Sequence, residues 1–355
     1  MADPMTLHLL LLAGDGIGPE ITAATEVVLH AASDRFGLGL ALGHAAIGFD
    51  ALASTGTTIP DAVIAQALAA DGVVLGPVSH NAYPPVAEGG HNPSGVLRRA
   101  LELYANIRPA RSHPQVPRPV AAPVDLIVVR ENLEGFYADR NMFQGGGEFM
   151  PEPGVALALR KVTAHGSLRI AEAAFALAAE RPALRLAAVH KANVMRLSDG
   201  LFLAQVRAVA ARYPQIAYEE VLVDACAALL VRDPGRFDVI VTTNMFGDIL
   251  SDLACELSGG LGLAASLNLG PSHALAQAQH GSAPDLAGLD CANPVSLIGS
   301  SAMLLRHLGK AGAADAIEAA LNSALCHPSS RTADLGGTIG TKAFAAHIAQ
   351  LVTES

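Results

Sequence analysis

Short apolar runs alternate with longer amphipathic segments along most of this chain, and this alternation constrains the fold more than any other feature. The short runs have the length of buried β-strands, and the segments between them have the Ala/Leu-rich periodicity of helices. This order predicts an α/β protein with a largely parallel sheet. The expected strands are Leu7–Ala13, Gly72–Leu75, Asp125–Val129, Arg185–His190, Glu219–Val223 and Val239–Thr242. The expected helices are Pro19–Ser33, Pro60–Ala70, Gly95–Leu103, Ser167–Glu180, Leu201–Ala211, Ala225–Arg232, Gly247–Ser258, Asn293–Leu308 and Ala311–Ala324.

Length and composition predict a folded chain with two lobes. A chain of 355 residues is about twice the usual length of one domain. Hydrophobic residues make up 51% of it and charged residues 16%, which excludes wholesale disorder. No low-complexity linker separates two halves, so we expect the lobes to be entwined through the sheet.

Charge and cysteine content exclude several classes of protein. The net charge of −10 argues against a broad nucleic-acid surface. The four cysteines are far apart and form no CxxC motif, which argues against a disulfide framework or a zinc site and favours a reducing cytoplasm. The apolar run Leu7–Ala13 is too short to cross a bilayer, so we expect no membrane association.

Two glycine-rich segments interrupt the periodic pattern. Gly14–Glu20 follows an expected strand and opens a helix, but its spacing is GxGxG, not the GxGxxG of a Rossmann loop. It is either a tight turn or a loop that contacts a ligand. The section Asn141–His165 combines a Gly145–Gly147 run with two prolines before an alternating stretch, and we interpret it as a protruding hairpin.

Three arginines are candidates for binding an anionic substrate. Arg98 and Arg108 belong to the segment Leu97–Pro109, and Arg130 follows an apolar strand. Guanidinium groups at the ends of buried elements can bind carboxylates in a bidentate manner. An exposed helix face is the alternative for Arg98, whereas a buried Arg108 would need an anionic partner.

Paired carboxylates suggest a metal site. Asp248 and Asp252 are four residues apart, on one face of an expected helix, where their like charges would favour a bound cation. Asp224, expected at the end of a strand, is a third candidate ligand. Oxygen ligands of this kind suit Mg²⁺ or Mn²⁺, although an Asp pair at this spacing is also common on exposed helices.

Lys191 and Tyr137 are candidates for proton transfer. Lys191 follows a strand, and Tyr137 lies seven residues after Arg130. A lysine beside a metal can act as a base, and a tyrosine can donate a proton. His280 opens a turn-rich loop whose Asp285 could hold a ribose diol.

Taken together and in order, these motifs resemble the β-decarboxylating dehydrogenases, the family of isocitrate, isopropylmalate, homoisocitrate and tartrate/D-malate dehydrogenases. The resemblance covers nearly the whole chain. It implies an isopropylmalate-dehydrogenase-like two-lobed α/β fold, not a Rossmann fold, and a homodimer or tetramer. The implied lobes are residues 1–103 plus 258–355 on the cofactor side, and residues 104–257 with the metal ligands, the dimer interface and the hairpin arm.

The family resemblance also assigns roles to individual residues. It implies that the substrate, a small hydroxy-acid with two or three carboxylates, is bound by Asn92, Ser94, Arg98, Arg108, Arg130 and Asn193. It implies that Mg²⁺ or Mn²⁺ is held by Asp248 and Asp252 of one subunit and Asp224 of the other. Lys191 of that other subunit would assist removal of the hydroxyl proton, and Tyr137 would protonate the enolate after CO₂ leaves.

The loop after His280 implies the cofactor. The implied cofactor-binding residues are His280, Gly281, Ser282, Ala283, Asp285, Leu286 and Asn293. Family members that use NAD are similar to this chain, in which Asp285 is followed by the aliphatic Leu286. Members that use NADP carry Lys-Tyr at these two positions. A carboxylate accepts hydrogen bonds from ribose hydroxyls and repels a 2′-phosphate, so we expect NAD.

Departures from the family pattern bear on the substrate. The polar, small residues Asn92 and Ser94, together with His190, are closer to isocitrate and homoisocitrate enzymes than to isopropylmalate enzymes, which carry leucines in that segment. We therefore expect an isocitrate- or homoisocitrate-like substrate. The alternatives are 3-isopropylmalate, tartrate or D-malate, and, in another class, a non-catalytic regulatory subunit. Gln277-Ala278-Gln279 stands where the family usually has Glu-Pro-Val.

Overall fold

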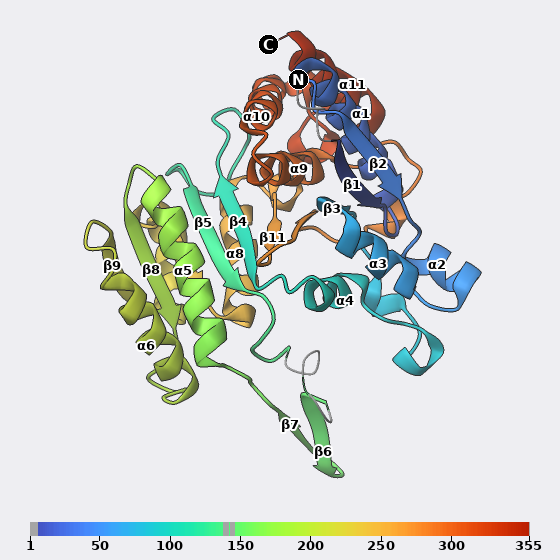
Figure 1. The fold of residues 1–355 in the computed structure, drawn as a ribbon. Helices are drawn as coiled ribbons and strands as arrows, with labels where there is room; N and C mark the ends of the chain where they lie inside the picture. The colour runs from blue at the N-terminus through green and yellow to red at the C-terminus, as the bar shows by residue number, and fades with distance from the viewer. Residues whose placement is uncertain (1–5, 138–141, 143–145, 355) are drawn as a thin grey trace. The chain divides into compact units, whose positions relative to one another are not determined.

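The computed structural model describes residues 6–137, 142 and 146–354 (Figure 1). The chain divides into two compact units, each assembled from separate stretches of sequence. Unit 1 contains residues up to Leu101, His113–Pro117 and the chain from Gly259 onward, and unit 2 contains Glu102–Ser112 and Arg118–Ser258.

Unit 1 contains five strands in the order β2-β1-β3-β12-β11. Strands β1, β2, β3 and β12 run parallel, and β11 pairs antiparallel with β12. The bounds of the strands are β1 Leu7–Leu12, β2 Leu40–His44, β3 Gly72–Leu75, β11 Leu267–Leu269 and β12 Ala274–Gln277. The helices are α1 Gly18–Phe36, α2 Gly48–Thr55, α3 Asp61–Ala69, α4 Pro93–Ala100, α9 Val295–His307, α10 Ala311–Leu325 and α11 Thr341–Glu354. Their core is aliphatic, with Leu9, Ile21, Leu297 and Phe344 nearly inaccessible to solvent.

Unit 2 contains a second run of five strands in the order β4-β5-β10-β8-β9. Strands β4 and β5 are antiparallel, and the other neighbours are parallel. The bounds are β4 Ala105–Arg111, β5 Asp125–Glu131, β8 Arg185–His190, β9 Ala217–Leu222 and β10 Val239–Thr242. The helices are α5 Ala164–Glu180, α6 Ser198–Ala210, α7 Val223–Arg232 and α8 Asn244–Ser258. Helices α5 and α6 cover one face of the strands, and α8 lies behind the other (Figure 1).

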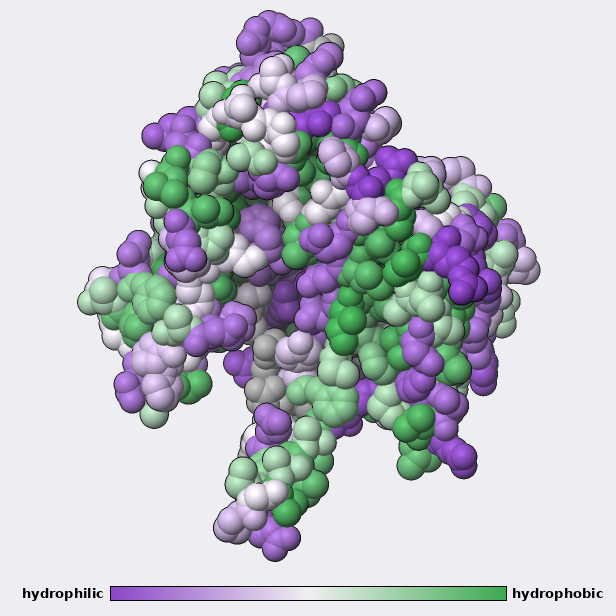
Figure 2. Space-filling view, turned by 180° about the vertical axis from the view of Figure 1, so that it is seen from behind, coloured by the Kyte–Doolittle hydropathy of each residue, from purple (hydrophilic) through white to green (hydrophobic). Residues whose placement is uncertain are grey.

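A two-stranded hairpin extends from unit 2. It consists of β6 Glu148–Glu152 and β7 Val155–Ala158, and all the residues of both strands are exposed. Hydrophobic side chains are visible on its surface (Figure 2), with Met150 64% and Phe149 48% exposed. The hairpin expected within Asn141–His165 therefore forms, although residues 141 and 143–145 lie outside the described part.

Several local expectations differ from the structure. Helix α4 ends at Ala100, not Leu103, because Glu102 adopts a positive φ of 54°. Asp224 does not end a strand but lies in the first turn of α7. No helix in the described residues combines the length and hydropathy needed to cross a membrane.

Candidate functional site

Asp248 and Asp252 share one arginine. Both lie on α8, and Arg108 Nη1 is 3.2 Å from Asp248 Oδ1 and 3.3 Å from Asp252 Oδ1. The Arg108 side chain is only 7% exposed, whereas the two carboxylates are 37% and 51% exposed. Arg108 is thus a buried cation that reduces the repulsion between two accessible carboxylates.

Arg108 is held in place by the strand and helix around it. It donates to Asn106, two residues earlier on the same face of β4, and to Ser251 Oγ at 2.8 Å. Burial and the neighbouring charge of Arg130 lower the pKa of Arg108 to about 10. The guanidinium is therefore still charged at neutral pH.

Arg130 packs against the same helix from β5. It forms an ion pair with Asp248 and donates through Nε and Nη2 to Asn244 Oδ1 at 3.0 and 2.7 Å. A Cβ on Gly247 would lie 2.6 Å from the Arg130 side chain, so the glycine permits this close approach. The Tyr137 hydroxyl donates to Asp248 Oδ2 at 3.2 Å. Arg108, Arg130, Tyr137, Asp248 and Asp252 are called the Asp248 cluster below.

Lys191 and Asp224 form a second pair in unit 2. Lys191 follows β8, and its Nζ lies 2.5 Å from Asp224 Oδ1. The hydrogen bond from Lys191 lowers the pKa of the Asp224 carboxyl. The neighbouring Asn193 is exposed in the turn that follows.

A buried carboxylate anchors the Lys191 backbone. Asp199 Oδ2 accepts from the Lys191 N–H at 2.5 Å, and Asp199 Oδ1 accepts from Arg160 Nη1 at the same distance. Arg160 also donates to Thr243 Oγ1 at 2.9 Å, just before α8. This network links the Lys191 segment to the helix that carries Asp248.

The three expected metal ligands do not meet within one chain. Among the described residues, no group of three or more His, Cys, Asp or Glu side chains could hold a metal ion. Asp248 and Asp252 still fit a hard divalent cation as a partial site, because they present accessible carboxylate oxygens on one helix face. The remaining ligands would have to come from elsewhere.

In unit 1 the expected substrate segment starts α4. Asn92 Oδ1 accepts from Gly95 N at 3.3 Å, so this side chain serves as an N-cap. Ser94 Oγ donates to Gln277 Oε1 at 3.1 Å, and Arg98 Nη2 donates to the same oxygen at 3.3 Å.

The expected cofactor loop packs on the glycine-rich turn after β1. Ser282 O accepts from the Ile17 N–H at 2.8 Å, and a Cβ on Gly16 would lie 2.0 Å from that oxygen. Gly16 also has a positive φ of 59°, so only glycine suits this contact. A Cβ on Gly14 would similarly lie 2.1 Å from Pro77 O. Close backbone packing explains both glycines.

The loop residues themselves differ in accessibility. Asp285 and Leu286 are exposed in a short 3₁₀ turn that follows Ala283. His280 Nε2 is buried without a hydrogen-bond partner in the described residues, and burial lowers the pKa of this imidazole. Open space lies beside Gly281. A buried polar atom without a partner in the described residues, together with an exposed carboxylate, fits a nucleotide.

Asn293 is engaged within unit 1. Its Nδ2 donates to Asp334 Oδ2 at 2.8 Å, and its Oδ1 accepts from Val295 N at 3.0 Å, at the start of α9. The expected contact with adenine stays a prediction.

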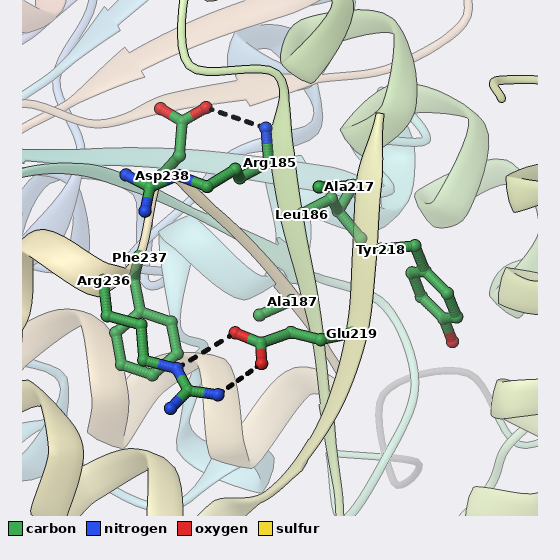
Figure 3. A pocket seen from close by; sticks show the side chains of 9 residues that line it. All are labelled: Arg185, Leu186, Ala187, Ala217, Tyr218, Glu219, Arg236, Phe237 and Asp238. Carbon is green, nitrogen blue, oxygen red and sulfur yellow. Dashed lines mark hydrogen bonds and ion pairs between the residues drawn. The ribbon is translucent and has the colours of Figure 1, made fainter. Parts of the chain in front are cut away.

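A cavity of about 260 Å³ lies at the amino ends of β8 and β9 (Figure 3). Its walls include Arg236 and Glu219, which form an ion pair at 2.5 Å, and Asp238, which accepts from the Arg185 N–H at 3.4 Å. None of the expected site residues lines this cavity.

Sequence reasoning missed several residues of these networks. Asp199, Arg160, Asn244 and Ser251 are polar and nearly or fully buried, and the sequence analysis assigned no role to any of them. The one available signal was the position of Asp199, eight residues after Lys191 and close to an expected helix start.

Both units are α/β, and unit 2 brings two buried arginines together with two accessible carboxylates. The family model described as isocitrate/isopropylmalate dehydrogenase matches residues 8–352. The chain belongs to this family of dehydrogenases. The resemblance, the α/β class and the departure from a Rossmann arrangement are thus confirmed.

Individual relatives agree with this assignment. The chain is 41% identical over 341 residues to an isocitrate/homoisocitrate dehydrogenase of Thermus thermophilus, covering 96% of this chain and 97% of that protein. It is 39% identical over 345 residues to a 3-isopropylmalate dehydrogenase of Methanothermobacter thermautotrophicus, covering 97% and 98%. The crystal structure of an isocitrate dehydrogenase from Methylococcus capsulatus matches with a TM-score of 0.88 at 39% identity, covering 98% of this chain and 100% of that one.

Proposed function

We propose that the protein catalyses the NAD-dependent oxidative decarboxylation of a 3-substituted (R)-malate to a 2-oxo acid and CO₂. The Asp248 cluster carries this proposal. It combines two buried guanidinium groups with two accessible carboxylates and a tyrosine, which suits a substrate with several carboxylates and a cation. The hydroxyl carbon would lose a hydride to NAD, and Lys191 of the partner subunit would assist removal of the hydroxyl proton. The C–C bond to the departing carboxylate then breaks.

Each residue of the cluster has a role in this reaction. Arg108 and Arg130 bind the carboxylates of the substrate and fix its orientation. Asp248 and Asp252 would hold Mg²⁺ or Mn²⁺. When bound, the cation supplies positive charge that favours ionised substrate oxygens, and NAD accepts the hydride. Tyr137, hydrogen-bonded to Asp248, delivers a proton to the carbon that CO₂ leaves.

Lys191 and Asp224 would complete the site of a second subunit. They pair with each other 2.5 Å apart, and the three carboxylates do not converge among the described residues of one chain. Exposed hydrophobic side chains near both groups support a homodimer. Leu197 is 91% exposed after Lys191, and Ile249 is 58% exposed beside Asp248.

NAD is favoured over NADP by the loop at Asp285. This exposed carboxylate can accept hydrogen bonds from ribose hydroxyls and would repel a 2′-phosphate. The buried, unpartnered His280 Nε2 supplies a further polar contact for the nucleotide.

A polar substrate of the isocitrate or homoisocitrate kind is favoured over isopropylmalate. Around Ser94 the segment is polar, since the Ser94 hydroxyl donates to the Gln277 amide at 3.1 Å. A branched alkyl group placed against polar groups leaves any that lose their partners unpaired, at about 1–3 kcal/mol each. The rival proposal, a non-catalytic regulatory subunit, is disfavoured because the Asp248 cluster and Lys191 are intact.

An assay of NADH formation tests the proposal. The purified protein with Mn²⁺ and NAD is incubated separately with isocitrate, homoisocitrate, isopropylmalate, tartrate and D-malate. We expect turnover with isocitrate or homoisocitrate at the highest kcat/KM. Absence of NADH formation with NAD, and of NADPH formation in parallel assays with NADP, for all five substrates would overturn the proposed activity. A higher kcat/KM for isopropylmalate would overturn the choice of substrate.

A further inference from the structure

Asp15 joins three segments of unit 1 through its side chain. It follows β1 in the glycine-rich turn and is only 7% exposed. Its Oδ1 accepts from the Phe49 N–H at 2.8 Å, in the helix after β2, and its Oδ2 accepts from the Ser79 N–H at 2.8 Å, in the loop after β3. The Tyr83 hydroxyl also donates to Oδ2. One carboxylate thus connects the chain at the carboxyl ends of three neighbouring parallel strands.

The surroundings of Asp15 are specific for a carboxylate. Gly48 has a positive φ of 71°, and a Cβ there would lie 2.3 Å from Asp15 Oδ1, so only glycine suits this position. The Tyr83 ring packs edge-on against the Phe49 ring, with 5.0 Å between the centroids. Burial and the hydrogen bond to Asp15 raise the pKa of the Tyr83 hydroxyl, which therefore remains a donor at neutral pH. A carboxylate accepts from all three donors, whereas an amide of the same size has only one acceptor oxygen.

The expected cofactor loop packs on two of the segments that Asp15 connects. Ser282, two residues after His280, is 8% exposed. Its Oγ lies 2.7 Å from Ser79 Oγ, and its carbonyl accepts from the Ile17 N–H at 2.8 Å. Because Asp15 binds the backbone N–H of Ser79, the Ser79 hydroxyl meets Ser282 from a fixed position. The path from Asp15 to the loop therefore runs through Ser79.

We propose that Asp15 is a positioning residue for NAD, because it holds Ser79 where its hydroxyl bonds Ser282 of the cofactor loop. This inference rests on the proposed function and adds a residue to its cofactor site. Without the carboxylate, the Ser79 N–H loses its acceptor and the loop can leave the conformation that binds the nucleotide. Ordering the loop then opposes binding, so the affinity for NAD falls.

Three variants test this path. Asp15→Ala removes the carboxylate, Ser79→Ala removes only the hydroxyl that reaches Ser282, and the third variant combines both changes. The control is Asp71→Ala. The Asp71 carboxylate also accepts from a backbone N–H, that of His8 at 2.8 Å, but it lies at the amino ends of β1 and β3. The control therefore removes a comparable hydrogen bond from the same strands, at the edge opposite to the cofactor loop.

The measurements are the Kd for NADH by calorimetric titration without substrate, and kcat and the KM for NAD with Mn²⁺ and the most active of the five substrates. We expect Asp15→Ala to raise the Kd for NADH and the KM for NAD about tenfold or more, while kcat changes less than about threefold. Ser79→Ala should raise both constants about fivefold. The double variant should resemble Asp15→Ala, because both changes break one path. Asp71→Ala should lower the Tm but leave both constants unchanged.

The outcomes distinguish this inference from the proposed function. If the unaltered protein oxidises none of the substrates with NAD or NADP, the proposed function fails, and the NADH titration still tests Asp15. If the unaltered protein does not bind NADH, both are overturned.

Two results overturn the inference alone. The first is that Asp15→Ala loses no more affinity for NADH than Asp71→Ala does. The second is that the effects of Asp15→Ala and Ser79→Ala multiply in the double variant, because the two residues then act independently. If Asp15→Ala does not fold, as judged from its Tm, Asp15→Asn replaces it, since this amide keeps the size and one acceptor oxygen. An unchanged Kd for NADH in Asp15→Asn then overturns the inference.

Discussion

The Lys191 ammonium group lies 2.5 Å from the Asp224 carboxylate, and both groups belong to residues that the family resemblance assigns to a neighbouring subunit's site. Lys191 follows β8, and Asp224 lies in the first turn of α7. Their pairing gives each chain one preformed set of groups that is separate from its Asp248 cluster.

A mixing experiment tests whether sites are shared between subunits. Lys191→Ala and Asp248→Asn should each abolish activity in a homodimer, because each site loses one essential group. After subunit exchange at equal amounts, half of the dimers are mixed and each contains one intact site. We expect about one quarter of the activity of the unaltered enzyme. If mass spectrometry verifies that the subunits have exchanged and no activity returns, the result contradicts a shared site.

Removal of one carboxylate from α8 should weaken metal binding. Asp252→Asn keeps the size of the side chain and removes a charge from an accessible oxygen pair. We expect kcat to fall about 100-fold or more and the Mn²⁺ concentration for half activity to rise. Full activity of the unaltered enzyme after exhaustive chelation would refute the metal requirement. Gln350→Glu, an exposed change on α11, serves as the control.

Cofactor preference should follow the charge at Asp285. Asp285→Lys replaces an exposed acceptor with a cation, so use of NAD should fall and use of NADP should rise. The ratio of kcat/KM for the two cofactors should shift toward NADP by about tenfold or more. An unaltered enzyme that uses NADP at least as well as NAD would disprove the assignment.

Asp199 should affect both stability and the behaviour of Lys191. Asp199→Asn leaves the buried Arg160 guanidinium without its charged partner, which typically costs about 3–5 kcal/mol of unfolding free energy. The Lys191 segment should also become less well positioned, so kcat should fall more than KM changes. The pH profile of kcat should shift if Lys191 is displaced. An unchanged profile at lower Tm would identify a purely structural role.

Glu131 should make stability depend on pH. Burial raises the pKa of its carboxyl from 4.5 to about 7, so the folded protein holds this proton more tightly than the unfolded chain does. This difference contributes on the order of 3 kcal/mol to the free energy of unfolding below about pH 4.5. The contribution is lost as the pH rises through about 7.

Glu131→Gln removes this titration. The Tm difference, variant minus unaltered protein, should therefore become more positive between pH 5 and pH 8 in scanning calorimetry. A constant difference across this range would show that Glu131 has an ordinary pKa. Glu148→Gln, on an exposed strand of the hairpin, controls for the change of charge.

Strands made of continuous apolar residues could be predicted closely from sequence. Gly72–Leu75, Arg185–His190 and Val239–Thr242 form with the expected bounds. Their residues are buried on both sides of a sheet, so hydrophobicity alone marks them. Strand β4 was missed because Asn106 and Arg108 interrupt its apolar pattern.

The sequence by itself determined the α/β class, the glycine-rich turn after β1 and the family, because these depend on local periodicity and on the order of motifs. Only the tertiary structure decided which charges meet. Arg108 tolerates burial because Asp248 and Asp252, about 140 residues later, face it from α8. Asp15 and Asp199 acquire their roles in the same way. Electrostatic and hydrogen-bond energies depend on distances in space, and local sequence patterns do not encode those distances.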